Sequence, residues 1–187
     1  MHRLLLVLIL PLFLDACASF QAYEQTHAIP AGSKLVLVRP LVIPSGTAHV
    51  YLQGVGRGAA GTHSVNQYET FCGVMVSSTS GGTIEPGTFT VTRYYQQAET
   101  IGLSLQKPTI VPVAARGGFV GIGGGNAGGT APLFFAATMD LHSDQQPNVR
   151  KLVCGAWAMP WDGQYPTVAE IQRAVEPYFQ IERAGGG

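Results

Sequence analysis

The sequence predicts a mainly β protein, built as a single β-sandwich or flattened barrel with one C-terminal helix. Several segments alternate apolar and polar residues with a period of two, which is typical of strands that bury one face. The chain also holds 24 Gly and 12 Pro residues, and these favour many turns and short strands over long helices. Helix signals of good quality occur in one place, near the C-terminus.

Four segments carry the apolar pattern of strands. They are residues 34–38, 47–53, 88–95 and 133–142. In the last segment the odd-numbered residues from Leu133 to Leu141 are apolar and predict a buried face. Thr138, Asp140 and His142 fall on the opposite face, which we expect to meet solvent.

A short motif containing Ile, Pro and Gly recurs at residues 29–33, 43–47 and 84–88. Pro sets φ near −65° and Gly permits positive φ, so each motif predicts a turn that starts a strand. The motifs begin 14 and 41 residues apart, and this irregular spacing excludes a solenoid or propeller repeat.

The predicted helix begins after Pro166. Thr167 and Glu170 have the spacing of a capping box, and the apolar residues that follow form one stripe. Pro177 should end or kink the helix, because it lacks an N–H to donate. Residues 180–187 then form a short final extension with a frayed tail.

The N-terminus combines a basic start, Met1-His2-Arg3, with an apolar run from Leu4 to Leu14. Eleven apolar residues are too few for a membrane-spanning helix, which needs about 20, but they suit the apolar region of a cleaved signal. The run ends in Leu14-Asp15-Ala16-Cys17. This arrangement resembles a bacterial lipoprotein signal, whose cysteine takes the lipid.

The resemblance implies a signal peptide at 1–16, a lipid-anchored tether at 17–28 and a single β-rich domain at 29–187. Cys17 would carry the lipid, palmitate included, and the absence of Asp after it implies the outer membrane, with the domain facing the periplasm. A competing cleavage site lies after Ala18, because Ala16-Cys17-Ala18 also fits an A-x-A pattern. The rest of the chain resembles small proteobacterial lipoproteins of unknown function.

Cys72 and Cys154 are the other two cysteines. In an oxidising compartment they predict a disulfide, and each falls on an apolar face from which it could meet the other across the core. The closed loop of about 80 residues is worth roughly 4 kcal/mol in the chain-entropy model. Two free buried thiols are the alternative. A metal site is less favoured, because no Cys-x-x-Cys spacing is present.

The charge pattern excludes a class of partners. The formal net charge is zero and 12% of residues are charged, against about 25% in an average soluble domain. There is no basic stripe of the kind that nucleic-acid binders use, nor a polybasic patch for anionic lipid. We therefore expect no nucleic-acid partner and a neutral protein or glycan partner instead.

Residues 117–129 are rich in glycine and include a G-x-G-x-x-G at Gly123, Gly125 and Gly128. A dinucleotide site would need a strand before this motif and a helix after it, but an alternating strand pattern follows. The segment predicts a mobile loop, and we expect no cofactor.

Asp140, His142 and Asp144 have strand spacing and donor atoms that suit a metal, and His49 could approach from another strand. The competing interpretation is a polar solvent face that runs into a turn. Glu69 with Glu85 or Glu99 could form a glycosidase-like pair, but no nucleophile motif accompanies them.

Trp157, Trp161 and Tyr165 lie close together in the sequence, with Asp162 and Gln164 between them. Aromatic faces beside polar groups predict a platform for a sugar or peptide. The alternative is that Trp157 packs beside the disulfide and Trp161 covers the start of the helix.

The favoured function is an anchored, non-enzymatic envelope protein that binds or scaffolds another envelope component. The second hypothesis is a hydrolase of peptidoglycan or another envelope glycan, centred on the metal candidates or the carboxylates. The third is a lipoprotein that binds a metal or small ligand.

Overall fold

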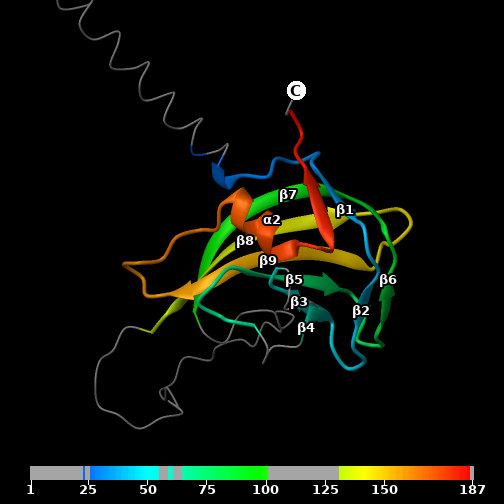
Figure 1. Ribbon diagram of the computed structural model, residues 1–187, viewed down its shortest axis with the longest axis horizontal. Coiled ribbons are helices and arrows are strands. Elements are labelled where there is room, and N and C mark those ends of the chain that lie inside the picture. The colour runs from blue at the N-terminus through cyan, green and yellow to red at the C-terminus, as the bar shows by residue number, and fades with distance from the viewer. Residues whose placement is uncertain (1–22, 24–25, 55–58, 61–64, 101–130, 186–187) are drawn as a thin grey trace, which may run out of the picture.

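A computed structural model describes residues 23, 26–54, 59–60, 65–100 and 131–185. These residues form one eight-stranded antiparallel sheet, a separate two-stranded sheet and a helix near the C-terminus. The large sheet curls into a half barrel, and the helix lies within the curl (Figure 1). The predicted mainly β fold with one C-terminal helix is confirmed.

The large sheet has the strand order β10-β1-β7-β8-β9-β5-β3-β4, and β2 pairs with β6 in the small sheet. The strands are β1 (Lys34–Leu37), β2 (Leu41–Ile43), β3 (His49–Leu52), β4 (Ala59–Ala60), β5 (Phe71–Val76), β6 (Gly82–Ile84), β7 (Gly87–Thr100), β8 (Leu133–His142), β9 (Val149–Ala158) and β10 (Phe179–Glu182). The helix is α2 (Val168–Val175).

Two register shifts between neighbouring strands contribute to the curvature of the sheet. The pairing of β7 with β8 shifts register between Val91 and Arg93, and that of β5 with β9 shifts between Met75 and Val76. An extra residue in one strand bends it and increases its twist. Among the described residues, β10 forms one edge of the sheet and β4 forms the other.

The main core lies on the inner face of the curl, under α2. Alternate residues of the strands and one stripe of the helix build it, as the period of two predicts. Its strand residues include Leu35, Val50, Leu52, Cys72, Val74, Phe89, Val91, Ala137, Met139, Leu152 and Cys154, and its helix residues are Ile171, Ala174 and Val175.

A second apolar cluster lies on the outer face of the sheet, and it corrects the expectation that one face of β8 meets solvent. Tyr51, Phe71, Phe134 and Ala136 are all buried there, and Thr138 is 2% exposed. Their rings pack across neighbouring strands, with 5.4 Å between the centroids of Phe71 and Phe134. The pattern of a single strand does not show which rings the adjacent strands place beside it.

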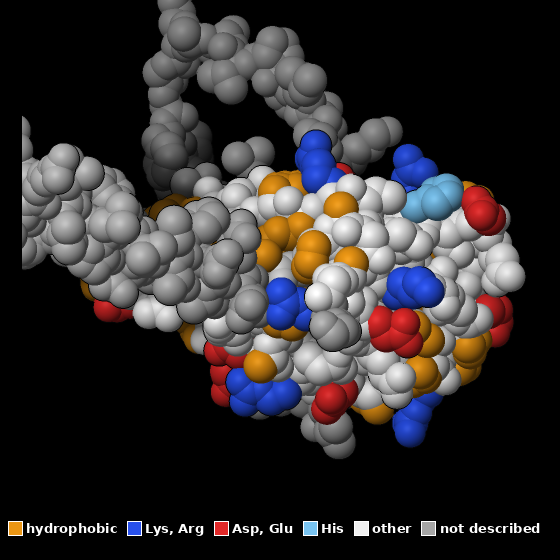
Figure 2. Space-filling view, turned by 90° about the horizontal axis from the view of Figure 1, so that it is seen from above, with side chains coloured by type: hydrophobic (Ala, Val, Ile, Leu, Met, Phe, Trp, Pro, Cys, Tyr) orange, Lys and Arg blue, Asp and Glu red, His pale blue; other side chains and the backbone are white. Residues whose placement is uncertain are grey.

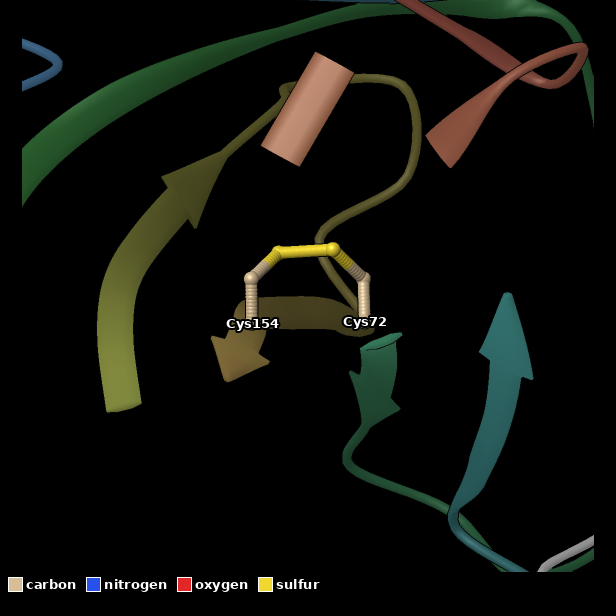
Figure 3. Close-up of a disulfide and its surroundings, with 2 residues drawn as sticks. All are labelled: Cys72 and Cys154. Carbon is tan, nitrogen blue, oxygen red and sulfur yellow. A yellow bond between two sulfur atoms is a disulfide. The ribbon is translucent and has the colours of Figure 1, made fainter. Parts of the chain in front are cut away.

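The predicted disulfide is present, but it does not bridge the core. Cys72 and Cys154 are register partners on the adjacent strands β5 and β9, with their Cα atoms 4.0 Å apart. Both side chains point to the inner face, where α2 lies over them (Figure 3). The bond therefore links two neighbouring strands of one sheet, although the two cysteines are 82 positions apart in the sequence.

Two of the three predicted turns have the expected geometry. Gly32 and Gly46 adopt positive φ angles of 88° and 84°. In each turn the following residue donates its N–H to the carbonyl of the Pro, as Ser33 does to Pro30 at 3.1 Å. The third motif differs, because Gly87 already belongs to β7 and pairs with Leu37 of β1.

The helix has the predicted cap and the predicted end. The Thr167 hydroxyl accepts from the Glu170 N–H at 3.2 Å, and the Glu170 carboxylate accepts from the Thr167 N–H at 2.8 Å. The helix ends at Val175, two residues before Pro177. The predicted short final extension contains a strand that the sequence pattern did not indicate, because Phe179–Glu182 forms β10 and pairs with β1.

Cys17, the predicted signal, most of the predicted tether and the glycine-rich segment lie outside the described residues. Within the described part of the chain, no helix combines the length and the apolar character that crossing a membrane requires.

Candidate functional site

The candidate site is a cleft of about 620 Å³ at the end of the sheet where β9 stops and α2 begins. Its walls come from the segment after β3, the loop before β5, the end of β9 and the segment that leads into α2. The lining residues are Gln53, Gly54, Tyr68, Glu69, Thr70, Ala156, Trp157, Ala158, Asp162, Gln164, Tyr165, Pro166, Thr167, Glu170, Arg173 and Ala174.

One wall is held by the side chain of Gln53, which is 9% exposed. Its amide nitrogen donates to the carbonyl of Asn66 at 2.8 Å, and its amide oxygen accepts from the Asn66 N–H at 2.7 Å. The N–H of Trp157 in β9 donates to the Gln67 carbonyl at 2.8 Å. Both contacts fix the loop that carries Tyr68 and Glu69 against the sheet.

The opposite wall is the helix. The N–H of Gly54 donates to the carbonyl of Ala174 at 2.8 Å, which ties the segment after β3 to the last turn of α2. Gly54 has a φ of 73°, and a Cβ at this position would lie 3.1 Å from the Arg173 carbonyl oxygen. A side chain here would be strained and crowded, so the close approach requires glycine.

Aromatic side chains from three segments of the chain line the cleft. Trp157 packs against Phe134 with 5.4 Å between ring centroids, and Tyr165 meets the ring of Phe135 edge-on at 5.8 Å. Tyr68 enters from the loop before β5 and is 74% exposed. Two rings are therefore held by a neighbouring Phe ring, and the third is open to solvent.

The structure brings together two of the three aromatic residues named for the predicted platform. Trp157 and Tyr165 line the cleft, but Trp161 is 68% exposed and is not among the lining residues. The competing expectation for Trp157 is also modified, since the ring packs on Phe134 of the outer cluster rather than beside the disulfide. The sequence did not reveal Tyr68, because its loop carries no motif and is held at the cleft by contacts with Gln53 and Trp157, which are distant in the sequence.

Three acidic residues and one basic residue line the cleft, namely Glu69, Asp162, Glu170 and Arg173. The Glu170 carboxylate takes part in the helix cap, where it accepts hydrogen bonds from both the N–H and the hydroxyl of Thr167. Of the carboxylates named as a glycosidase-like pair, only Glu69 lines the cleft. The structure therefore does not assemble the expected pair there.

Glu85 and Glu99 lie elsewhere in the fold. The backbone of Glu85 exchanges two hydrogen bonds with the side chain of Gln146, at 2.9 and 2.7 Å. Glu99 is in β7, where its carboxylate accepts from Gln97. Burial raises the pKa of Glu99, while the bond from Gln97 and the charge of Lys151 act in the opposite direction.

The predicted metal ligands are engaged differently. Asp140 lies between two cations, 3.2 Å from Arg93 Nε and 3.3 Å from Lys151 Nζ, on the outer face of the sheet. His142 and Asp144 contact each other at 3.1 Å, where both side chains are mostly exposed. Within the described ranges, no three His, Cys, Asp or Glu side chains are grouped as metal ligands.

His49 does not join these residues in a metal site. Its ring lies 4.9 Å from the ring of Tyr51 on β3, and burial lowers its pKa. The pKa of Lys151 is shifted in the opposite direction, upward. Burial acts to lower the pKa of its ammonium group, but Tyr95 and Asp140 beside it outweigh burial and raise it. The strand alternation correctly placed Asp140 on the outer face but did not reveal that cations from both neighbouring strands flank it.

The chemistry of the cleft suits binding. Its walls combine aromatic faces with carboxylate, amide and guanidinium groups, the mixture found in sites for polar ligands. Over the face seen in Figure 2, Lys and Arg side chains are interspersed with Asp and Glu side chains. Comparison of the chain with family models, with curated proteins and with solved structures finds no match.

Proposed function

We propose that this protein is a lipid-anchored component of the cell envelope that binds or scaffolds another envelope molecule, without catalysis. Cys17 carries the lipid, the outer membrane is the site of anchoring, and the β-rich domain faces the periplasm. The cleft beside α2 is where the partner binds. The cleft is the single observation that carries the binding role.

Three features of the cleft support binding over catalysis. Its walls are fixed by backbone and side-chain hydrogen bonds from Gln53, Gly54 and Trp157, so its shape is preformed. Rigid walls reduce the ordering cost of association. The Glu170 carboxylate serves the helix cap, and the candidates Asp140 and His142 do not line the cleft. The hydrolase hypothesis therefore has no assembled centre among the described residues.

The end of the predicted tether supports an anchored domain of defined orientation. The ring of Tyr23 stacks on His27 with 4.3 Å between centroids. The carbonyl of His27 accepts from the Tyr94 hydroxyl and, at 3.4 Å, from the Gln96 amide, both on β7. The residues just before the sheet are thus attached to β7.

Mass spectrometry of the mature N-terminus tests the anchor. We expect an acylated Cys17, and Cys17→Ala should move the protein from the membrane fraction to the soluble fraction. An unmodified N-terminal Ser19 in the wild-type protein would exclude the lipid anchor and establish cleavage after Ala18.

Site-specific photocrosslinking in the native envelope tests the cleft. A photoreactive phenylalanine analogue placed at Tyr68 should give a discrete adduct, because this residue lines the cleft. The matched control places the same analogue at Trp161, which is similarly exposed but outside the lining. Equal labelling from both positions, or none from Tyr68, would contradict the proposal that the cleft is the binding site.

A further inference from the structure

We propose that the cleft beside α2 recognises carbohydrate, taking the sugar rings of an envelope glycan rather than a peptide strand. This inference rests on the proposed binding function and names the class of ligand. Three observations support it. Backbone N–H groups around the cleft already have acceptors within the protein, aromatic rings line the cleft, and planar polar side chains stand beside them.

The backbone around the cleft is already hydrogen-bonded within the protein. Seven backbone N–H groups there donate to acceptors within the protein. They belong to Gly54, Tyr68, Glu69, Trp157, Asp162, Thr167 and Glu170. Peptide recognition by strand addition depends on free main-chain N–H and C=O groups along an edge. Donors for a ligand at these seven positions must therefore come from side chains.

The side chains available suit hydroxyl groups. Gln164, Asp162 and Arg173 line the cleft and are exposed, and each ends in a planar group with two or three polar atoms. Neighbouring hydroxyls on a sugar ring present a donor and an acceptor at a spacing that such planar groups can meet with paired hydrogen bonds. Gln53 is excluded from this role, because both ends of its amide bind Asn66.

The aromatic rings supply the apolar part of the site. Trp157 and Tyr165 are half-buried and each packs against one Phe ring, while Tyr68, from the loop before β5, is mostly exposed. The π face of an aromatic ring carries partial negative charge, and the axial C–H bonds of a sugar ring carry partial positive charge. A sugar can therefore lie flat on an aromatic face while its hydroxyls reach the polar rim.

The shape of the site fits a segment of a polymer better than a small enclosed molecule. The volume of about 620 Å³ lies within the range of small-ligand sites, but Tyr68 on one wall is 74% exposed. An open cleft of this kind leaves both ends of a chain free to continue into solvent.

Tryptophan fluorescence gives a direct test. The chain has two Trp residues, so Trp161→Phe leaves Trp157 in the cleft as the single reporter. The full-length protein carrying this change, in a detergent without a sugar headgroup, is titrated with chitotetraose, cellotetraose and maltotetraose. Tetra-alanine is the peptide probe. We expect a saturable change of Trp157 emission with at least one oligosaccharide and none with the peptide.

Variants connect the signal to the cleft. Tyr68→Ala in the Trp161→Phe background should weaken oligosaccharide binding by about tenfold, since an aromatic contact contributes up to roughly 1.5 kcal/mol. Tyr23→Ala is the matched control, because Tyr23 is another exposed Tyr but lies at β7, outside the cleft lining. It should leave the dissociation constant unchanged. Thermal unfolding of each variant confirms that the fold is retained.

The outcomes separate the two proposals. A response to tetra-alanine alone overturns carbohydrate recognition and leaves the binding function intact. The absence of a response to any oligosaccharide at millimolar concentration overturns it as well, and so does a response that Tyr68→Ala does not weaken. The binding function itself fails only if, in addition, photocrosslinking from Tyr68 gives no specific adduct, meaning none beyond those also obtained from the Trp161 position.

Discussion

The side chain of Gln172 in α2 pairs with the backbone of Ile181 in β10. Its amide oxygen accepts from the Ile181 N–H at 2.9 Å, and its amide nitrogen donates to the Phe179 carbonyl at 3.0 Å. These two backbone groups point away from β1, so one amide side chain takes the place that a further strand would occupy. Exposed strand edges invite pairing with other chains, and this amide covers the edge formed by β10.

Replacing Gln172 should therefore weaken the fold and expose the edge. We expect Gln172→Leu to lower the free energy of unfolding by about 1–3 kcal/mol, because two hydrogen bonds are lost at a part-buried position. Gln172→Glu keeps the acceptor for Ile181 but not the donor for Phe179, so its loss should be smaller. Urea denaturation measures both, and size-exclusion chromatography reports self-association. A monomeric Leu variant of wild-type stability would contradict the capping role.

The disulfide should contribute substantially to stability. Cys72→Ala combined with Cys154→Ala removes a bond that closes a loop across 82 positions, and the expected loss is about 4 kcal/mol. Non-reducing peptide mapping establishes the bond, and denaturation in the presence and absence of reductant measures its effect. Cys17→Ala is the control, since it removes the third cysteine and leaves the pair. Equal stability of the oxidised and reduced wild type would refute the prediction.

His49 should make the protein less stable as the pH falls. Burial lowers the pKa of His49 in the folded protein below its ordinary value of 6.5. The unfolded chain therefore binds a proton at higher pH than the folded protein does. The contribution of neutral His49 to the free energy of unfolding is fully present above pH 6.5 and is lost as the pH falls below that value. His49→Gln should reduce this loss. Denaturation midpoints at pH 8, 6.5 and 5.5 measure the effect, and identical pH dependence in the two proteins would show that His49 is not responsible.

Tyr94 should hold the end of the predicted tether against the sheet. Its hydroxyl donates to the carbonyl of His27 and accepts from the amide of Gln96 at 2.9 Å. Tyr94→Phe removes the hydroxyl and keeps the ring, so we expect faster amide hydrogen exchange around residues 26–29 with little change in global stability. Tyr95→Phe is the matched control, because the neighbouring hydroxyl contacts Lys151 instead. If exchange is accelerated equally in both variants, Tyr94 does not anchor this segment.

Local patterns predicted the elements well. The alternation at Phe89 and Val91 correctly identified the buried face of β7, and Thr167 with Glu170 correctly located the start of α2. These successes share one cause. Strand faces and helix caps depend on residues a few positions apart, and the sequence displays those spacings directly.

The site was predicted less completely. Trp157 and Tyr165 were identified from the sequence, but Tyr68 was not, because 89 residues separate it from Trp157. The environment of Asp140 was hidden for the same reason, since Arg93 and Lys151 come from two different strands. Cross-strand neighbours are set by register and strand order, which no single segment specifies.

The sequence by itself determined that the protein is mainly β, that a capped helix follows the strands, and that Cys72 and Cys154 both face the core. Only the tertiary structure decided that these cysteines are bonded across adjacent strands, that Gln172 covers the edge at β10, and that Tyr68 and Trp157 line the same cleft. The physical reason is the range of the interactions. Periodicity and capping act between near neighbours, whereas these three arrangements exist only after a curled sheet has brought distant segments together.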